Sequence, residues 1–235
     1  MLIFIDIETT GLEDEDKICS MGIIYEENNS IKSQHELFND GKKIKAKASS
    51  INNITNEMLL NKPTFKTSIL YKFLDKHNDK STILVGHTIE DDIKKLVKVG
   101  FSFQGKILNT KRTSKHLIKE CESYTLKFLR YELKLYKEED EERKRLDLDE
   151  NLCGSKALHD AIIVKLLYNY LLNIQSQDTM LSLSFKNVLL EKFEFGKYKG
   201  RYIQEVCEND KGYLEWLLSN MDLDDDLRYS ISYYL

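Results

Sequence analysis

Two carboxylates close to the N-terminus have the residue types and the spacing of a metal site. Asp6 and Glu8 stand two residues apart in FIDIETTGL, where the apolar run Leu2–Ile7 predicts a buried strand. Side chains two apart on a strand point to the same face, so the carboxylates would lie side by side. Burying adjacent negative charges is costly unless a cation compensates them, and hard oxygen ligands favour Mg²⁺ or Mn²⁺ over zinc. In the alternative interpretation, both carboxylates emerge into water at the strand end.

The same string resembles the first motif of a known enzyme family. The DnaQ-like 3′→5′ exonucleases of the DEDD superfamily, which include the exonuclease-X-like enzymes, carry D-x-E-T-T-G-L on their first strand. This chain matches every defined position of that motif, with Asp6, Glu8, Thr9, Thr10, Gly11 and Leu12. The resemblance implies a ribonuclease H-like α/β fold, in which helices flank a mixed β-sheet.

Two further motifs of this family are matched in part. The second, G-H-N-x-x-F-D, corresponds to Gly86–Asp92, with threonine and aspartate in place of the family's asparagine and phenylalanine. The third, H-x-A-L-x-D-A, corresponds to residues 155–161, and its aspartate is Asp160. Ser155 occupies the position of the histidine that serves the family as general base. All four motif carboxylates are therefore present, but the motif histidine is not.

The resemblance implies a reaction and a set of roles. Phosphodiester hydrolysis would use two Mg²⁺ or Mn²⁺ ions. The implied ligands are four carboxylates: Asp6, Glu8 and Asp160 would hold one ion, Asp6 would bridge to the second, and Asp92 would act partly through water. The Thr9–Leu12 turn and His87 would contact the substrate. The expected partner is nucleic acid with a free 3′ end, single strands being favoured, and DNA is expected with RNA as an alternative.

The absence of the motif histidine leaves two functions open. A positioned base contributes roughly 10²- to 10⁴-fold to a rate, and Ser155 cannot act as one at neutral pH. His159 is the nearest substitute, but adjacent helix positions point about 100° apart, which favours a place on the helix flank over a catalytic one beside Asp160. We predict a weakened exonuclease, and the alternative is a non-catalytic nucleic-acid-binding homologue. Retention of four mutually repelling carboxylates favours the enzyme.

Apolar periodicity predicts the elements that would position these residues. After the first strand, two more strands are expected over Lys17–Tyr25 and Ser33–Phe38, which gives a β-meander. A short strand over Thr82–Val85 would lead into the second motif, and the strongest apolar helix, Lys156–Leu172, would carry the third. The other expected helices are Ala48–Leu60, Pro63–Lys76, Glu90–Val99, Ser123–Leu135 and Thr179–Leu190. The charged run Lys137–Glu150 is interpreted as a solvated loop or helix end.

A change of composition near Phe193 predicts a second unit. We expect an exonuclease domain over residues 1–175, a helical linker over 176–192 and a small α+β module over 193–235. The module resembles one found behind exonuclease-X-like domains. A strand predicted there alternates basic and aromatic side chains suited to nucleic-acid contact, namely Lys197, Tyr198, Lys199 and Arg201. Lysines that are merely solvated on a β-hairpin are the alternative.

Composition limits the partners and the compartment. The chain has 235 residues with 39 acidic and 35 basic side chains, and the acidic surplus lies within residues 193–235. Nucleic-acid binding must therefore come from a local site rather than from bulk charge. No apolar run reaches the roughly 20 residues of a membrane span. Four scattered cysteines, Cys19, Cys121, Cys153 and Cys207, form no paired motif. These features predict a cytoplasmic protein without a membrane partner.

Overall fold

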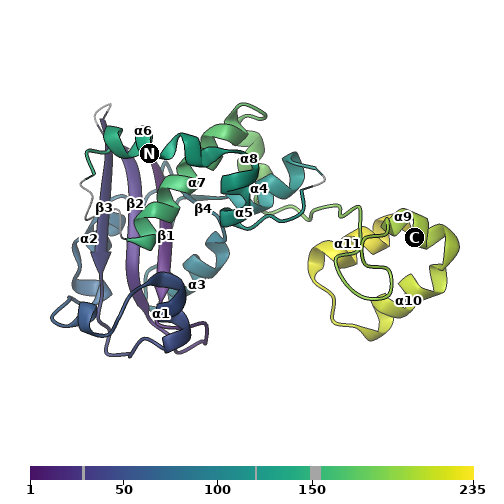
Figure 1. Cartoon of the computed structure of the whole chain (residues 1–235), viewed down its shortest axis with the longest axis horizontal. Coiled ribbons are helices and arrows are strands. Elements are labelled where there is room, and N and C mark those ends of the chain that lie inside the picture. Colours follow the sequence, from purple (N-terminus) through teal and green to yellow (C-terminus); the bar gives the residue numbers. More distant parts are fainter. Residues whose placement is uncertain (28–29, 120, 149–154) are drawn as a thin grey trace. The chain divides into compact units, whose positions relative to one another are not determined.

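The first of two compact units is built on a mixed β-sheet. The computed structural model describes residues 1–27, 30–119, 121–148 and 155–235, which divide into Met1–Ser184 and Phe185–Leu235. The sheet of the first unit has five strands in the order β3-β2-β1-β4-β5 (Figure 1). The strands are β1 (Leu2–Thr9), β2 (Ile18–Glu27), β3 (Ser30–Leu37), β4 (Ile83–Gly86) and β5 (Lys106–Asn109). The first three form the predicted antiparallel meander, and the last two continue the sheet in parallel. The predicted ribonuclease H-like α/β class is confirmed.

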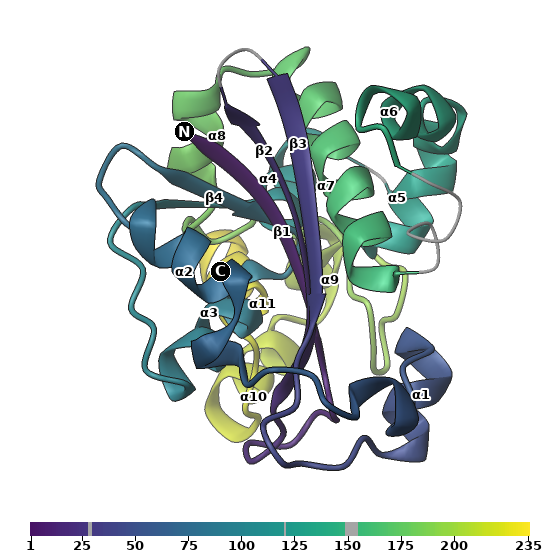
Figure 2. The same ribbon diagram turned by 90° about the vertical axis from the view of Figure 1, so that its left-hand side faces the viewer.

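Helices cover both faces of this sheet (Figure 2). They are α1 (Ala46–Asn52), α2 (Ile69–Lys76), α3 (Ile89–Lys98), α4 (Thr110–Leu117), α5 (Leu126–Glu132), α6 (Glu139–Arg145), α7 (Lys156–Leu172) and α8 (Gln177–Leu183), with 3₁₀ turns at Glu57–Leu59, Phe65–Thr67 and Leu135–Lys137. Successive side chains of β1 point to opposite faces of the sheet, so the core has two parts. Phe4 packs with α7 on one face, whereas Ile3 and Ile5 pack with α2 and α3 on the other. Asp6 and Glu8 lie two and four residues after Phe4 on the same strand, so their side chains point to the same face and toward α7.

The long helix α7 has the bounds that the sequence predicts, and its closeness to the sheet depends on a glycine. Phe4 of β1 and Tyr168 of α7 meet edge to face, with ring centroids 5.2 Å apart. Near its N-terminus the backbone of α7 lies against Gly22 of β2, where a Cβ would be only 2.4 Å from the Leu158 nitrogen. Gly22 therefore sets how closely α7, and with it Asp160, approaches β1.

The charged segment Lys137–Glu150, predicted to be a solvated loop or helix end, is exposed over most of its described residues but not over all of them. Residues 139–145 form α6, and two of its glutamates are buried. Glu139 accepts hydrogen bonds from the guanidinium of Arg130, and Glu142 accepts one of 2.6 Å from Lys165 on α7. Both buried glutamates pair with a cation on another helix, which the charge pattern of the run does not indicate. Residues 149–150 of this run, and Cys153, lie outside the described residues.

The helices between β3 and β4 are shorter than predicted. α1 ends at Asn52, because Asn53 adopts a left-handed conformation with φ of 59°. The helix expected from Pro63 begins only after Ser68, whose Oγ accepts a hydrogen bond of 3.0 Å from the Tyr71 nitrogen. A left-handed residue thus sets the end of α1, and a side-chain cap sets the start of α2.

The second unit has a hydrophobic core of its own. It contains α9 (Ile203–Asn209), α10 (Lys211–Asn220) and α11 (Asp225–Tyr234), which bury Ile203, Leu214 and Ile231 together. The segment predicted as a basic strand forms turns instead, and a single-residue bridge pairs Lys192 with Tyr202. The boundary between the units falls inside the stretch 176–192, since α8 packs against α4 and β5 of the first unit. Among the described helices, none has the length and hydrophobicity needed to cross a membrane.

Candidate active site

A cluster of carboxylates forms where the end of β1 meets α7. Asp6 and Glu8 come from β1 and Asp160 from the second turn of α7, and one oxygen from each lies within 4.8 Å of the others. Burial raises the pKa of Asp6 well above its usual value, and the charge of Asp92, in the first turn of α3, raises it further. The fold therefore brings three of the predicted carboxylates together and holds the fourth close enough to interact with them.

The cluster has the electrostatic character of a cation site. Asp6 Oδ2 is buried and lacks a hydrogen-bond partner among the residues that the structure describes. Burial, followed by the charges of Asp91 and Glu8, raises the pKa of Asp92 well above its usual value. Buried oxygen donors that repel one another and include an unpaired atom fit a hard divalent cation such as Mg²⁺ or Mn²⁺. The donor set contains no sulfur or imidazole, which fits zinc less well.

A lysine that sequence reasoning missed also belongs to the cluster. Lys156, the first residue of α7, donates a hydrogen bond to Glu8 Oε1 and another, of 2.7 Å, to Asp160 Oδ2. Burial opposes protonation of Lys156, but the charges of Asp160 and Glu8 outweigh burial and raise its pKa. The four-residue spacing to Asp160 on a helix was a usable signal. The contact with Glu8 joins residues 148 apart in sequence and had no local signal.

Ser155, which stands at the position of the motif histidine, and His159, the nearest substitute for it, both have structural partners. Ser155 caps α7, since its Oγ accepts a hydrogen bond of 3.3 Å from the Leu158 nitrogen. His159 Nε2 lies 3.1 Å from Glu139 Oε2, and Glu139 also binds the guanidinium of Arg130. The imidazole is therefore engaged with α6 rather than with the carboxylate cluster.

His87, predicted to contact substrate, is a buried histidine with two partners inside the protein. Its Nδ1 lies 3.1 Å from Thr110 Oγ1, and its Nε2 lies 2.8 Å from the carbonyl oxygen of Tyr124. Burial lowers the pKa of His87 to about 4, so the ring is neutral at pH 7. Both nitrogens are thus engaged inside the protein, and the substrate contact of His87 stays a prediction. The side chain ties the end of β4 to the start of α4 and to the segment before α5.

A cavity of about 180 Å³ adjoins Glu8. One wall is the turn after β1, and the other is α1 with the residue before it. The lining residues are Thr9, Gly11 and Leu12 on the first wall and Lys45, Lys47, Ala48, Ile51 and Asn52 on the second.

The position of the two walls follows from an irregularity in β1. The register of the β1–β2 pairing shifts between Glu8 and Thr9, and a shift of this kind bends the chain away from the sheet. Asn52 Nδ2 donates a 3.3 Å hydrogen bond to the Thr9 carbonyl and so joins the two walls. Leu12 is 82% exposed and Ile51 53% exposed, which leaves apolar surface on each wall.

Thr10, also predicted to contact substrate, is buried within the loop that follows the turn. Its Oγ1 donates a 3.0 Å hydrogen bond to Asp16 Oδ1 and accepts one from the Lys17 nitrogen. Gly11 leaves room for Asp16, since a Cβ there would be 2.3 Å from the Asp16 carboxylate. Thr10 therefore supports the wall of the cavity but does not line it.

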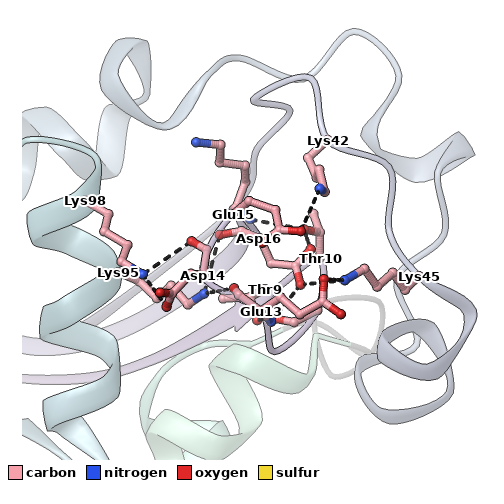
Figure 3. A network of polar contacts seen from close by, with 12 residues as sticks. Thr9, Thr10, Glu13, Asp14, Glu15, Asp16, Lys42, Lys45, Lys95 and Lys98 are labelled. Atoms are coloured by element: carbon pink, nitrogen blue, oxygen red, sulfur yellow. Dashed lines mark hydrogen bonds and ion pairs between the residues drawn. The ribbon is translucent and has the colours of Figure 1, made fainter.

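Lysines hold the acidic loop 13–16 from two sides (Figure 3). From the segment before α1, Lys45 contacts Glu13 at 2.6 Å and Asp16 at 3.1 Å. From α3, Lys95 donates a 2.7 Å hydrogen bond to the Glu13 carbonyl, and Lys98 contacts Asp14 at 2.6 Å. The loop is thus tied to α3, which carries Asp92, and to the wall of the cavity.

The basic residues predicted to contact nucleic acid in the second unit have acidic partners. Lys197 lies 3.0 Å from Asp210, and the Tyr198 hydroxyl donates a 2.7 Å hydrogen bond to the same carboxylate. Arg201 pairs with Glu205 of α9, while Lys199 is exposed. Much of the positive charge of this segment is therefore compensated locally.

Comparison with known proteins agrees with this architecture in both units. The family model described as Exonuclease matches residues 3–140, and the model described as Exodeoxyribonuclease X-like C-terminal matches residues 193–222. Exodeoxyribonuclease 10 of Escherichia coli strain K12 is 26% identical over 239 residues, which cover 100% of this chain and 99% of the relative. A PolC-type DNA polymerase III of Caldanaerobacter subterraneus subsp. tengcongensis is 30% identical over 141 residues, or 57% of this chain and 10% of the polymerase.

Solved structures share the fold. Exonuclease X in complex with 5′ overhanging duplex DNA superimposes with a TM-score of 0.59 at 21% identity, over 78% of this chain and 99% of that one. Escherichia coli exonuclease I in complex with a dT13 oligonucleotide gives a TM-score of 0.53 at 12% identity, over 77% of this chain and 42% of that one. With the Exonuclease model matching more than half of its length and the carboxylates gathered at the end of β1, the chain belongs to the exonuclease family.

Proposed function

We propose that this protein is a 3′→5′ exonuclease that hydrolyses DNA with the help of two Mg²⁺ or Mn²⁺ ions. The observation that carries the proposal is the cluster of Asp6, Glu8 and Asp160, in which the buried Asp6 Oδ2 lacks a partner among the described residues. Membership of the exonuclease family, whose members depend on divalent metal ions, gives this cluster its chemistry. The full-length match to an exodeoxyribonuclease supports DNA over RNA as substrate.

The carboxylates would divide between two tasks. Asp6, Glu8 and Asp160 would hold one ion, and Asp92 with Asp6 would hold the second. Bound divalent ions supply Lewis acidity, which stabilises charge on the phosphate and promotes ionisation of the attacking water. In the reaction, an oxygen from water bonds to phosphorus while the bond to the leaving 3′ oxygen breaks. The fixed packing of α7 on β1 keeps Asp160 in register with Asp6 throughout.

The cavity beside Glu8 would receive the terminal nucleotide. Its two exposed apolar side chains, Leu12 and Ile51, suit the faces of a base, whereas the exposed Lys47 suits a phosphate. One wall ends at Glu8, so a nucleotide seated there would place its phosphate next to the carboxylates. An unpaired 3′ end would enter this pocket without breaking base pairs. We therefore propose single-stranded 3′ ends as the favoured substrate.

The chain offers no histidine contact at the cluster among the described residues, which supports slow turnover. Ser155 caps α7, and His159 binds Glu139. Activation of water would then rest on the bound cations and the surrounding carboxylates alone, without the roughly 10²- to 10⁴-fold contribution of a positioned base. The proposal is accordingly an active but weakened exonuclease.

A pair of labelled oligonucleotides tests this function. Single-stranded DNA labelled at its 3′ end should release labelled mononucleotide at once, and the same strand labelled at its 5′ end should shorten stepwise, with Mg²⁺ or Mn²⁺ but not with a chelator. Asp160→Asn should abolish both products, whereas Asp75→Asn, which changes an exposed carboxylate on α2, should not. RNA of the same sequence provides the comparison of substrates. Binding without metal-dependent cleavage in the wild type would support the non-catalytic alternative and overturn the proposal.

A further inference from the structure

Lys156 places a positive charge inside the carboxylate cluster. Its ammonium group donates hydrogen bonds to Glu8 on β1 and to Asp160 one turn further along α7. Both partners are carboxylates to which the proposed function assigns a metal ion. The side chain therefore does for two ligands what a cation would do: it neutralises their repulsion and holds them near each other.

This contact differs from the surface ion pairs of the same protein. The side chains of Lys156, Glu8 and Asp160 are only 30%, 11% and 20% exposed. By contrast, the Lys94–Asp91 pair on α3 is 72% and 68% exposed, and exposed pairs of this kind contribute little. Partial burial lowers the effective dielectric around Lys156, so its charge acts strongly on anything that binds the same carboxylates.

An ammonium and a divalent ion cannot share these carboxylates without cost. Two positive charges a few ångström apart repel each other, and hydrogen bonding by Lys156 occupies an oxygen on Glu8 and one on Asp160. Lysine has a flexible four-carbon stem, which lets the ammonium leave without moving the backbone of α7. Lys156 stabilises the carboxylates of the metal-free protein by some free energy. By linkage, the free energy of metal binding becomes less favourable by the same amount.

We propose that Lys156 is a tethered counter-cation that competes with the divalent ion for Glu8 and Asp160, so that metal binds only as the ammonium withdraws. This inference rests on the metal site of the proposed function. It makes Lys156 a residue that sets the metal concentration at which the site fills. It also gives the metal-free protein a preformed cluster, in which the ligands are already at mutual contact distance.

Direct metal binding tests the proposal without any substrate. Mn²⁺ binding is measured by isothermal titration calorimetry on chelator-treated wild type, Lys156→Met and Lys156→Arg. Lys156→Met should bind Mn²⁺ about tenfold more tightly, because a unit charge a few ångström from the ion is removed. Lys156→Arg keeps that charge and should remain close to the wild type. Lys94→Met is the matched control, and it should change the affinity by less than about twofold, since its exposed pair lies outside the cluster.

Thermal unfolding provides a second readout. Without metal, Lys156→Met should have a lower Tm than the wild type, because Glu8 and Asp160 lose their shared partner. At equal, saturating Mn²⁺ the gain in Tm should be larger for the variant, since a tenfold lower Kd adds about 1.4 kcal/mol of stabilisation. If Lys156→Met does not fold, as judged by circular dichroism, Lys156→Gln takes its place, because it keeps a hydrogen-bond donor without the charge.

Unchanged or weaker Mn²⁺ binding in the charge-removing variant would overturn the inference. Asp6→Asn, which should lose Mn²⁺ binding, verifies that the measured ion occupies this cluster. The two proposals fail in different ways. A wild type that binds Mn²⁺ but releases no nucleotide would contradict the exonuclease and leave the competition intact, whereas normal cleavage with no effect of Lys156→Met would contradict the competition alone.

Discussion

Gly22→Ala tests whether close packing of α7 on the sheet is what assembles the carboxylate cluster. Gly22 on β2 pairs with Asp6 on β1, and the backbone of α7 lies directly above it. A Cβ built on Gly22 would be 2.4 Å from the Leu158 nitrogen and 2.5 Å from the Ala157 carbonyl carbon. These neighbours are backbone atoms in a helix and cannot rotate away, so the helix itself must move.

The size of the effect follows from that distance. Ordinary contacts of a Cβ begin near 3.4 Å, so the N-terminal end of α7 must withdraw by about 1 Å. Overpacking of this kind typically costs about 1–3 kcal/mol of stability. Since Lys156 and Asp160 move with the helix, both lose register with Glu8 and Asp6 on β1. A misplacement of about 1 Å in a catalytic group can reduce the rate by about 100-fold.

Urea unfolding of the metal-free protein and Mn²⁺ titration together measure this effect. Gly22→Ala should unfold at lower urea and bind Mn²⁺ more weakly, and cleavage of a 3′-labelled strand should fall by about 100-fold. Gly212→Ala, at an exposed position near the start of α10 with open space around it, is the matched control and should keep stability within about 0.5 kcal/mol of the wild type. The reasoning is refuted if Gly22→Ala keeps stability within about 0.5 kcal/mol of the wild type together with its Mn²⁺ affinity.

Two further predictions concern the histidine positions. The pKa of His87 in the folded protein is about 4, below the ordinary value near 6.5. The buried neutral ring therefore contributes fully to the free energy of unfolding above pH 6.5, and this contribution is lost as the pH falls toward 4. By pH 5 this loss is about 2 kcal/mol, and urea unfolding of His87→Gln should therefore show a flatter pH profile between 7.5 and 5; parallel profiles would contradict this assignment. Ser155→His, which restores the motif base, should raise the cleavage rate at saturating Mn²⁺ by up to about 100-fold. Its loss of the N-cap should cost about 1 kcal/mol, and an unchanged rate in a folded variant would show that the base is not limiting.

The sheet and its carboxylates could be predicted because their signals are local. Alternation along β1 fixes which side chains share a face, so Asp6 and Glu8 had to lie on the same side of the sheet. The apolar density of α7 fixes the helix that carries Asp160, and its predicted bounds, Lys156–Leu172, are those of the structure. In both cases a few consecutive residues determine the outcome.

Contacts between distant segments could not be predicted in the same way. Glu142 looked like a solvated residue of a charged run, yet it is buried against Lys165 of α7. His87 stood within a motif, which suggested a contact with substrate; in the structure, Thr110 and Tyr124 engage both of its nitrogens. The free-energy cost of burying a charged or polar side chain depends on its partners. These partners lie elsewhere in the sequence, and the periodicity of apolar residues carries no information about them.

The proposals for Ser155 and Lys156, the two residues at the start of α7, predict effects on different steps of the same reaction. Ser155 lacks a basic nitrogen and caps the helix, so its effect should appear in the rate once metal is bound. Lys156 holds Glu8 and Asp160, so its effect should appear in how much metal is needed. On the proposed competition, the lysine keeps the two ligands together before the ion arrives and at the same time raises the metal concentration at which the site fills.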